Sequence, residues 1–124
     1  MVRTLKANEI ECRVGQTDKK NGIPTWCTLL LYKDARVDYK VLDETYGVLG
    51  WKCGYEEIKG HLYCTISIYD KESGEWISKQ NVGTETNTEA IKGEASDAFK
   101  RAAFLCGIGR ELYSAPKIFV KLSQ

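Results

Sequence analysis

Three apolar segments that follow one another at short intervals constrain the fold of this 124-residue chain most strongly. They span residues 51–58, 61–69 and 75–82. In the second segment apolar and polar side chains alternate, as they do in a strand with one buried face. Parallel strands need a crossover of about a dozen residues, and the turns here are far shorter. The pattern therefore predicts an antiparallel meander, in which we expect Trp76 to face inward and Lys79 to face outward.

A second pair of strands is predicted near the N-terminus. Residues 10–14 alternate between apolar and polar, and residues 25–32 are rich in apolar and β-branched side chains. The turn at 18–22 between them contains Asn21-Gly22, the strongest short signal for a tight hairpin.

Two helices complete the pattern. Residues 35–46 have helical spacing, with Asp34 as a candidate N-cap and Gly47 as the residue that ends the helix. The longer helix begins at a capping box over residues 86–89 and ends at Gly107. Small and apolar side chains recur along it at three- and four-residue steps and predict its buried stripe: Ile91, Ala95, Ala98, Phe99, Ala102 and Cys106.

The order β-β-α-β-β-β-α indicates an α+β fold in which an antiparallel sheet packs against helices. The length fits a single domain over residues 1–124. Residues 1–8 and 115–124 are expected to be loose ends or to take part in subunit contacts.

Composition excludes several classes of protein. Five cysteines with no C-x-x-C pair, and a single histidine, indicate reduced, buried thiols and no metal site. No apolar run reaches the length of a membrane span and no signal core is present, so a cytoplasmic protein is expected. Phosphate-loop, G-x-S-x-G and H-E-x-x-H motifs are absent, so we expect neither an enzyme nor a cofactor.

The net charge of +1 is spread unevenly. Residues 1–40 carry +3, residues 41–88 carry −4 and residues 89–124 carry +2. Two basic ends that met in the fold would make a positive face. Taken alone, the charge distribution is better explained by chance. The basic residues of the long helix could also form a solvated face paired with Glu89, Glu94 and Asp97.

Residues 81–113 carry a distinctive motif. Its centre is a Lys-x-x-Ala-Ser-Asp-Ala-Phe-Lys-Arg-Ala helix that closes on Gly-Ile-Gly-Arg. Upstream, residues 35–37 and 42–47, followed by Trp51, fit the same pattern. The chain resembles the Rad52 family of single-strand annealing proteins, and in particular its short phage members, called Sak, over roughly residues 10–113.

This resemblance implies an ATP-independent protein that binds single-stranded DNA and anneals complementary strands in recombination and repair. It implies a homo-oligomer, either a ring or a helical array, in a bacterial host cell if the gene is phage-derived, with a host or phage single-strand-binding protein as a further partner. The family's phosphate-contacting pair matches Lys100 and Arg101, and a strand arginine matches Arg13. Lys92, Arg36 and Arg110 complete the candidate DNA contacts.

Two other functions remain open from the residues. An antiparallel sheet backed by helices also serves double-stranded RNA or general nucleic-acid binding. Exposed sheet edges could instead mediate assembly of a structural or interaction protein that binds no nucleic acid.

Overall fold

The structure is a computed structural model of the chain that describes residues 2–84, 90–114 and 118–122. The chain divides into two compact units. The first, called here the helical unit, comprises Met1–Thr4 and Ala35–Gly109. The second, the hairpin unit, comprises Leu5–Asp34 and Arg110–Gln124. The predicted α+β class is confirmed, with the strands divided between two three-stranded sheets, one in each unit.

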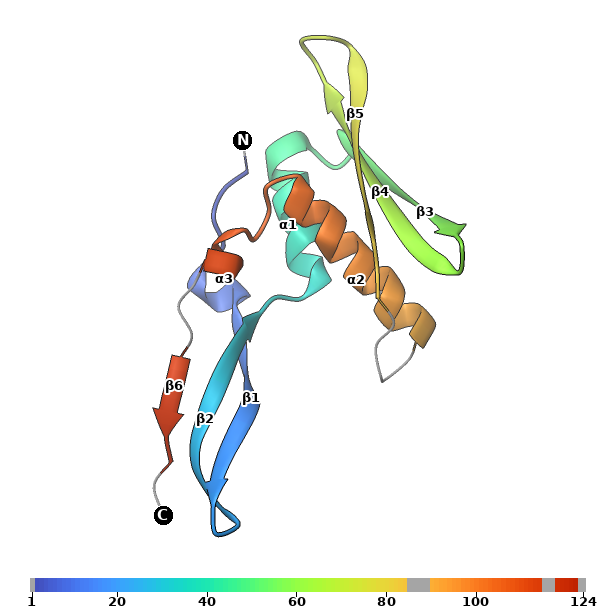
Figure 1. The fold of residues 1–124 in the computed structure, drawn as a ribbon. Helices are drawn as coiled ribbons and strands as arrows, with labels where there is room; N and C mark the ends of the chain where they lie inside the picture. The colour runs from blue at the N-terminus through green and yellow to red at the C-terminus, as the bar shows by residue number, and fades with distance from the viewer. Residues whose placement is uncertain (1, 85–89, 115–117, 123–124) are drawn as a thin grey trace. The chain divides into compact units, whose positions relative to one another are not determined.

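The helical unit contains an antiparallel sheet and two helices (Figure 1). The sheet has the order β3-β4-β5, and the elements are α1 (Ala35–Tyr46), β3 (Trp51–Ile58), β4 (His61–Asp70), β5 (Glu75–Val82) and α2 (Ala90–Leu105). Both helices end at the predicted glycines, since Gly47 and Gly107 adopt positive φ angles. The predicted capping box at 86–89 lies outside the described residues.

The core of the helical unit lies between its helices and the central strand. Val41 and Leu42 of α1 meet Cys64 and Ile66 of β4, and all four side chains are fully buried. From α2 the core receives Ala98, Phe99, Ala102 and Ala103. The predicted stripe on α2 is thus confirmed at its centre, and small alanines let the helix approach the sheet closely.

The predicted orientation of β5 was wrong. Trp76 is 42% exposed and pairs with Tyr69, on the sheet face opposite to buried Ile66. Lys79 pairs with Ile66 and therefore lies on the helix-facing side. An edge strand beside a narrow helix has little of either face buried, so its polarity does not reveal which side points inward.

The hairpin unit is built on the sheet β1-β2-β6. Its elements are the 3-10 turn η1 (Ala7–Glu9), β1 (Glu11–Lys20), β2 (Ile23–Tyr32), α3 (Glu111–Ser114) and β6 (Ile118–Lys121). The predicted hairpin is confirmed, and Asn21 and Gly22 both have positive φ, as a type I′ turn requires. The three short elements were not predicted. Pairing of β6 with β2 adds a strand within the C-terminal segment.

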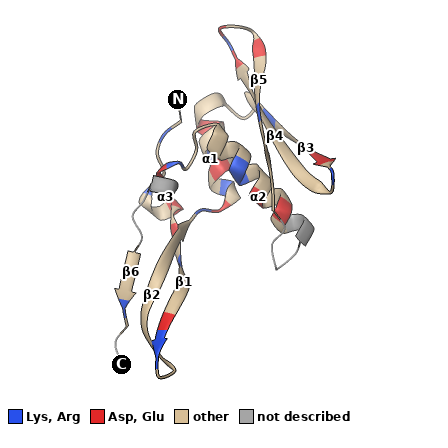
Figure 2. Cartoon of the chain, in the orientation of Figure 1, with Lys and Arg blue, Asp and Glu red and all other residues tan. Residues whose placement is uncertain are grey.

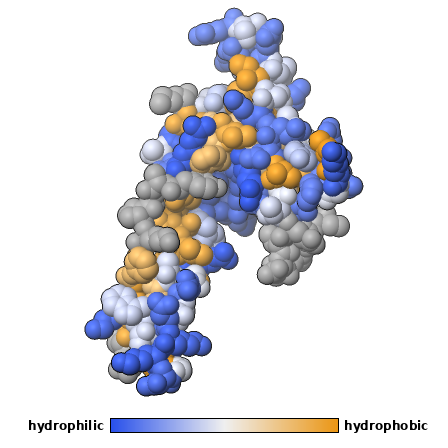
Figure 3. Space-filling view, viewed as in Figure 1, coloured by the Kyte–Doolittle hydropathy of each residue, from blue (hydrophilic) through white to orange (hydrophobic). Residues whose placement is uncertain are grey.

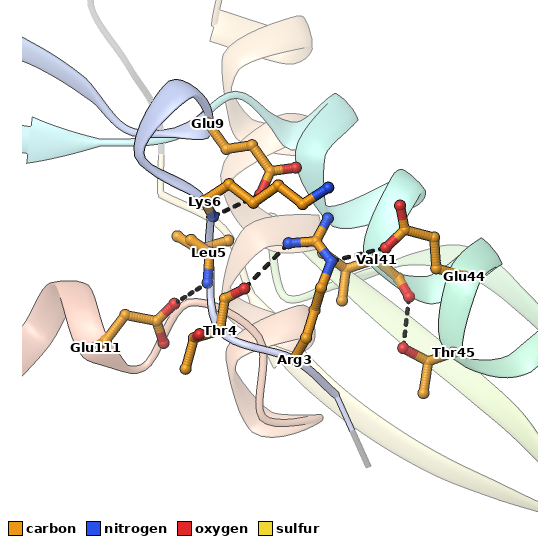
Figure 4. Close-up of polar contacts among 9 residues, drawn as sticks. All are labelled: Arg3, Thr4, Leu5, Lys6, Glu9, Val41, Glu44, Thr45 and Glu111. Atoms are coloured by element: carbon orange, nitrogen blue, oxygen red, sulfur yellow. Dashed lines mark hydrogen bonds and ion pairs between the residues drawn. The ribbon is translucent and has the colours of Figure 1, made fainter.

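Hydrogen bonds near the N-terminus fasten segments within each unit (Figure 4). In the helical unit, Arg3 Nε donates to Glu44 Oε2 at 2.7 Å. In the hairpin unit, the Leu5 amide donates to Glu111 Oε1 at 2.7 Å, and the Lys6 amide donates to Glu9 Oε1 at 2.8 Å. Arg3, Leu5 and Lys6, which lie in the segment expected to be loose or to take part in subunit contacts, thus each make a hydrogen bond within their own unit. None of the described helices has the length and apolarity that crossing a membrane would require.

Candidate nucleic-acid interface

The candidate interface is built on α2, whose buried stripe sets the direction of its basic residues. Phe99 and Ala102 are fully buried against the sheet and α1. Lys100 and Arg101 lie between these positions in the sequence, so the helical period turns them away from the core. Figure 2 shows basic residues in blue and acidic residues in red along α2. The Arg101 side chain is 44% exposed.

Asp97 fixes Arg101 on the helix surface. The Arg101 Nε donates to Asp97 Oδ2 at 3.0 Å, which confirms the predicted pair at i and i+4. The same oxygen accepts hydrogen bonds from the Thr84 amide at 2.9 Å and from the Thr84 hydroxyl at 3.0 Å. Burial acts to raise the pKa of Asp97, but the Thr84 hydrogen bonds and the Arg101 charge outweigh it, so that pKa is lowered. Asp97 therefore stays ionised and anchors the chain after β5 to α2.

Lys100 differs from Arg101 in its surroundings. Among the described residues it makes no ion pair, and its side chain is half-buried. Glu94 is one of the carboxylates that could neutralise this helix face. It accepts a hydrogen bond from the Leu62 amide of β4 at 2.6 Å. Asp97 is likewise engaged, by Arg101 and Thr84. Of the two cations of α2 whose side chains the structure describes, Lys100 is thus the one that the described carboxylates leave available to an anion.

Two more predicted residues belong to the helical unit. Lys92 lies two turns before Lys100 on α2, so both positions fall along one side of the helix, although the Lys92 side chain is outside the described set. Arg36 is exposed in the first turn of α1.

Arg13 and Arg110 belong to the hairpin unit. Arg13 is exposed on β1, and its guanidinium lies 5.6 Å from the centre of the Tyr32 ring, a cation–π distance. Arg110 is exposed and begins the C-terminal part of this unit, directly after Gly109. The structure therefore places four predicted residues in one unit and two in the other.

Two features of the helical unit were missed by sequence reasoning. One is the Thr84–Asp97 anchor, for which the local sequence gives no distinctive signal. The other is a cluster on the outer face of the sheet, where Lys52 Nζ lies 4.3 Å from the Trp76 ring centre and Tyr69 meets Trp76 edge-on. Correct assignment of the faces of β5 would have revealed this cluster.

The thiols and carboxylates that the structure describes show no metal-binding arrangement. Within the described ranges, no three His, Cys, Asp or Glu side chains gather closely enough to hold an ion. All five cysteines are free; Cys27 and Cys64 are buried as predicted, whereas Cys12 and Cys53 are exposed. Burial raises the pKa of Cys64 to about 12, so this thiol is not a nucleophile at neutral pH.

Comparison with known sequences finds a family match. A sequence model of the Rad52/22 family, described as double-strand break repair proteins, matches the chain over residues 1–124. No curated protein and no solved structure matches it.

Proposed function

Because the chain belongs to the Rad52/22 family of double-strand break repair proteins, we propose that it binds single-stranded DNA and anneals complementary strands without ATP, as a homo-oligomer. Membership assigns the chain to DNA repair and recombination by single-strand annealing. We propose three further properties: α2 binds phosphates, annealing needs no ATP, and the chain assembles into an oligomer.

The observation that carries the proposal is the adjacent pair Lys100 and Arg101 on the outside of a firmly packed helix. Cations held at fixed positions bind phosphates without reading the base sequence. This suits annealing, in which the bases must remain available for pairing. Asp97 orients the Arg101 guanidinium, and Lys100 presents a charge that no described carboxylate neutralises.

Repetition of the site explains how a chain with a net charge of +1 can bind DNA. A pair of cations neutralises few phosphates and supports only weak binding by one subunit. In an oligomer the same strand crosses several copies, and each later contact is intramolecular. Such multivalency can raise affinity by about 10²- to 10⁴-fold without any new contact.

The test is a charge reversal on α2. The double variant Lys100→Glu/Arg101→Glu should lose binding of a fluorescent oligo-dT and lose annealing of complementary strands in a nucleotide-free assay. The control is Lys71→Glu, which reverses an exposed charge in the turn between β4 and β5. It should bind and anneal like the parent, and circular dichroism should show that both variants are folded.

Light scattering on the same samples measures the assembly. Unchanged binding by the double variant would remove α2 from the interface. A parent protein that is monomeric and does not anneal would overturn the proposed function. Preference for duplex RNA in competition would identify a different class of nucleic-acid binder.

A further inference from the structure

The sheet of the hairpin unit has one face that the α2 site does not explain. Pairing in the sheet places Arg13 opposite Leu30, Thr28 opposite Phe119 and Trp26 opposite Lys121. Paired residues, and alternate residues along a strand, share a face. One face, called here the aromatic face, therefore holds Arg13, Trp26, Leu30, Tyr32, Phe119 and Lys121.

The rings of the aromatic face are open to solvent. Trp26 is 43% exposed, Tyr32 38% and Phe119 63%. On the side in view, Figure 3 shows hydrophobic side chains along the middle of the hairpin unit and hydrophilic ones toward the hairpin turn. Large rings exposed together on one surface commonly mark a binding site.

The composition of the face indicates its occupant. Aromatic side chains alternating with cations are the means by which sheets hold unpaired bases, which stack on the rings while the cations meet the phosphates. Arg13 already lies over the Tyr32 ring, 5.6 Å from its centre, so a cation and a ring are presented together. Trp26 and Tyr32 are six residues apart on β2, roughly 20 Å along a strand, which leaves room for several nucleotides.

The charge of the unit fits the same occupant. The hairpin unit holds eight Lys and Arg against five Asp and Glu, whereas the helical unit holds ten against twelve. The positive balance of the chain thus belongs to the unit that carries the aromatic face. Glu11 and Asp18 lie opposite Tyr32 and Trp26 at the ends of this face, so phosphate attraction alone would be modest there. Affinity would come mainly from stacking.

We propose that the aromatic face is a base-stacking surface for single-stranded nucleic acid, distinct in chemistry from the phosphate contacts of α2. The inference rests on the proposed function, because it assumes that the ligand is a single strand. It adds Trp26, Tyr32 and Phe119 to the binding residues and gives Arg13 a position beside the bases.

The test compares oligo-dT with an abasic oligonucleotide of the same length. The parent should bind oligo-dT more tightly. Loss of one stacked base reduces affinity by about 5- to 150-fold, so Trp26→Ala and Phe119→Ala should each weaken oligo-dT binding by at least about fivefold. Both variants should bind the abasic strand like the parent. Trp76→Ala, which removes an equally exposed ring from the other sheet, should leave the difference between the two ligands unchanged.

A conservative variant distinguishes loss of stacking from loss of folding. Trp26→Phe keeps an aromatic ring but removes one fluorophore, so it should retain oligo-dT affinity while the quenching of tryptophan fluorescence by oligo-dT falls. Equal affinity of the parent for both ligands would overturn the stacking surface and leave phosphate binding intact. A change in assembly size without a change in base dependence would instead assign the face to contacts between copies. Absence of any single-strand binding by the parent would overturn the proposed function as well.

Discussion

At the scale of single residues, Asp97 is the group on which the candidate interface depends. One of its oxygens accepts hydrogen bonds from Arg101 and from two groups of Thr84. Because its pKa is lowered in the folded chain, the ionised carboxylate stabilises the fold. This stabilisation is complete above the ordinary pKa of 3.8 and is lost as the pH falls through the lowered folded value.

Replacement of Asp97 by Asn tests how much the ionised carboxylate stabilises the fold. We expect Asp97→Asn to reduce the free energy of unfolding by roughly 1 kcal/mol at pH 7, since charge-assisted hydrogen bonds are lost. The difference between parent and variant should shrink as the pH is lowered from 5 toward 2, where the parent carboxylate also becomes neutral. Urea denaturation of parent and variant from pH 7 to pH 2 measures this difference in the free energy of unfolding. A difference that stays constant with pH would show that Asp97 acts without its charge.

Single substitutions should separate the roles of Lys100 and Arg101. Lys100→Ala should lower single-strand affinity and reduce the salt slope by about 0.7, the value for one phosphate contact, with unfolding unchanged. Arg101→Ala should also cost about 0.3–0.5 kcal/mol of stability, because it removes a helical ion pair. Anisotropy titrations at several salt concentrations, paired with thermal unfolding, provide both readouts. Identical behaviour of the two variants would contradict this division.

At the scale of elements, two of the hairpin turns have the same backbone geometry with different residues. Each has two residues with positive φ, Asn21-Gly22 between β1 and β2 and Lys59-Gly60 between β3 and β4. Asparagine tolerates this conformation, whereas a lysine side chain is strained in it.

The strained turn gives a prediction of increased stability. Lys59→Asn should raise the free energy of unfolding by about 0.5–1 kcal/mol, because the strain of a lysine in the left-handed region is relieved. Guanidinium denaturation of parent and variant measures the effect. The reverse change at the other turn, Asn21→Lys, is the matched control and should destabilise the hairpin unit. Equal stability of parent and Lys59→Asn would mean that the turn relaxes without cost.

Most of the helices, strands and turns could be predicted from the sequence, because local signals are strong where one face of an element is buried. The stripe through Ala98 and Phe99 and the Asn21-Gly22 turn are of this kind. Trp76 was assigned to the wrong face, since an edge strand exposes both of its sides. Strand β6 was missed because its four residues are ordered by pairing with β2, which lies about ninety positions away in the sequence. Division into two sheets likewise depends on such long-range pairing.

At the scale of the whole molecule, the charges are divided between the two units. The helical unit carries Lys100 and Arg101 within an overall negative balance, and the hairpin unit is positive. Neither unit resembles a strongly basic nucleic-acid binder, and the two proposed surfaces use different chemistry. A single subunit would thus hold a strand weakly, and the proposed oligomer is what would make binding tight.

Binding of one strand by several copies predicts that the salt dependence of affinity increases with strand length. If the α2 pair alone contacts phosphates, one subunit contributes a slope of about 1.4 in a plot of log affinity against log salt. A strand long enough to cross several copies should give a slope several times larger, while a strand that spans one copy should approach the single-subunit value. Titrations with oligo-dT of increasing length measure this, with light scattering to verify that assembly size is constant. A slope independent of length would mean that copies do not share a strand, and multivalency could not explain tight binding.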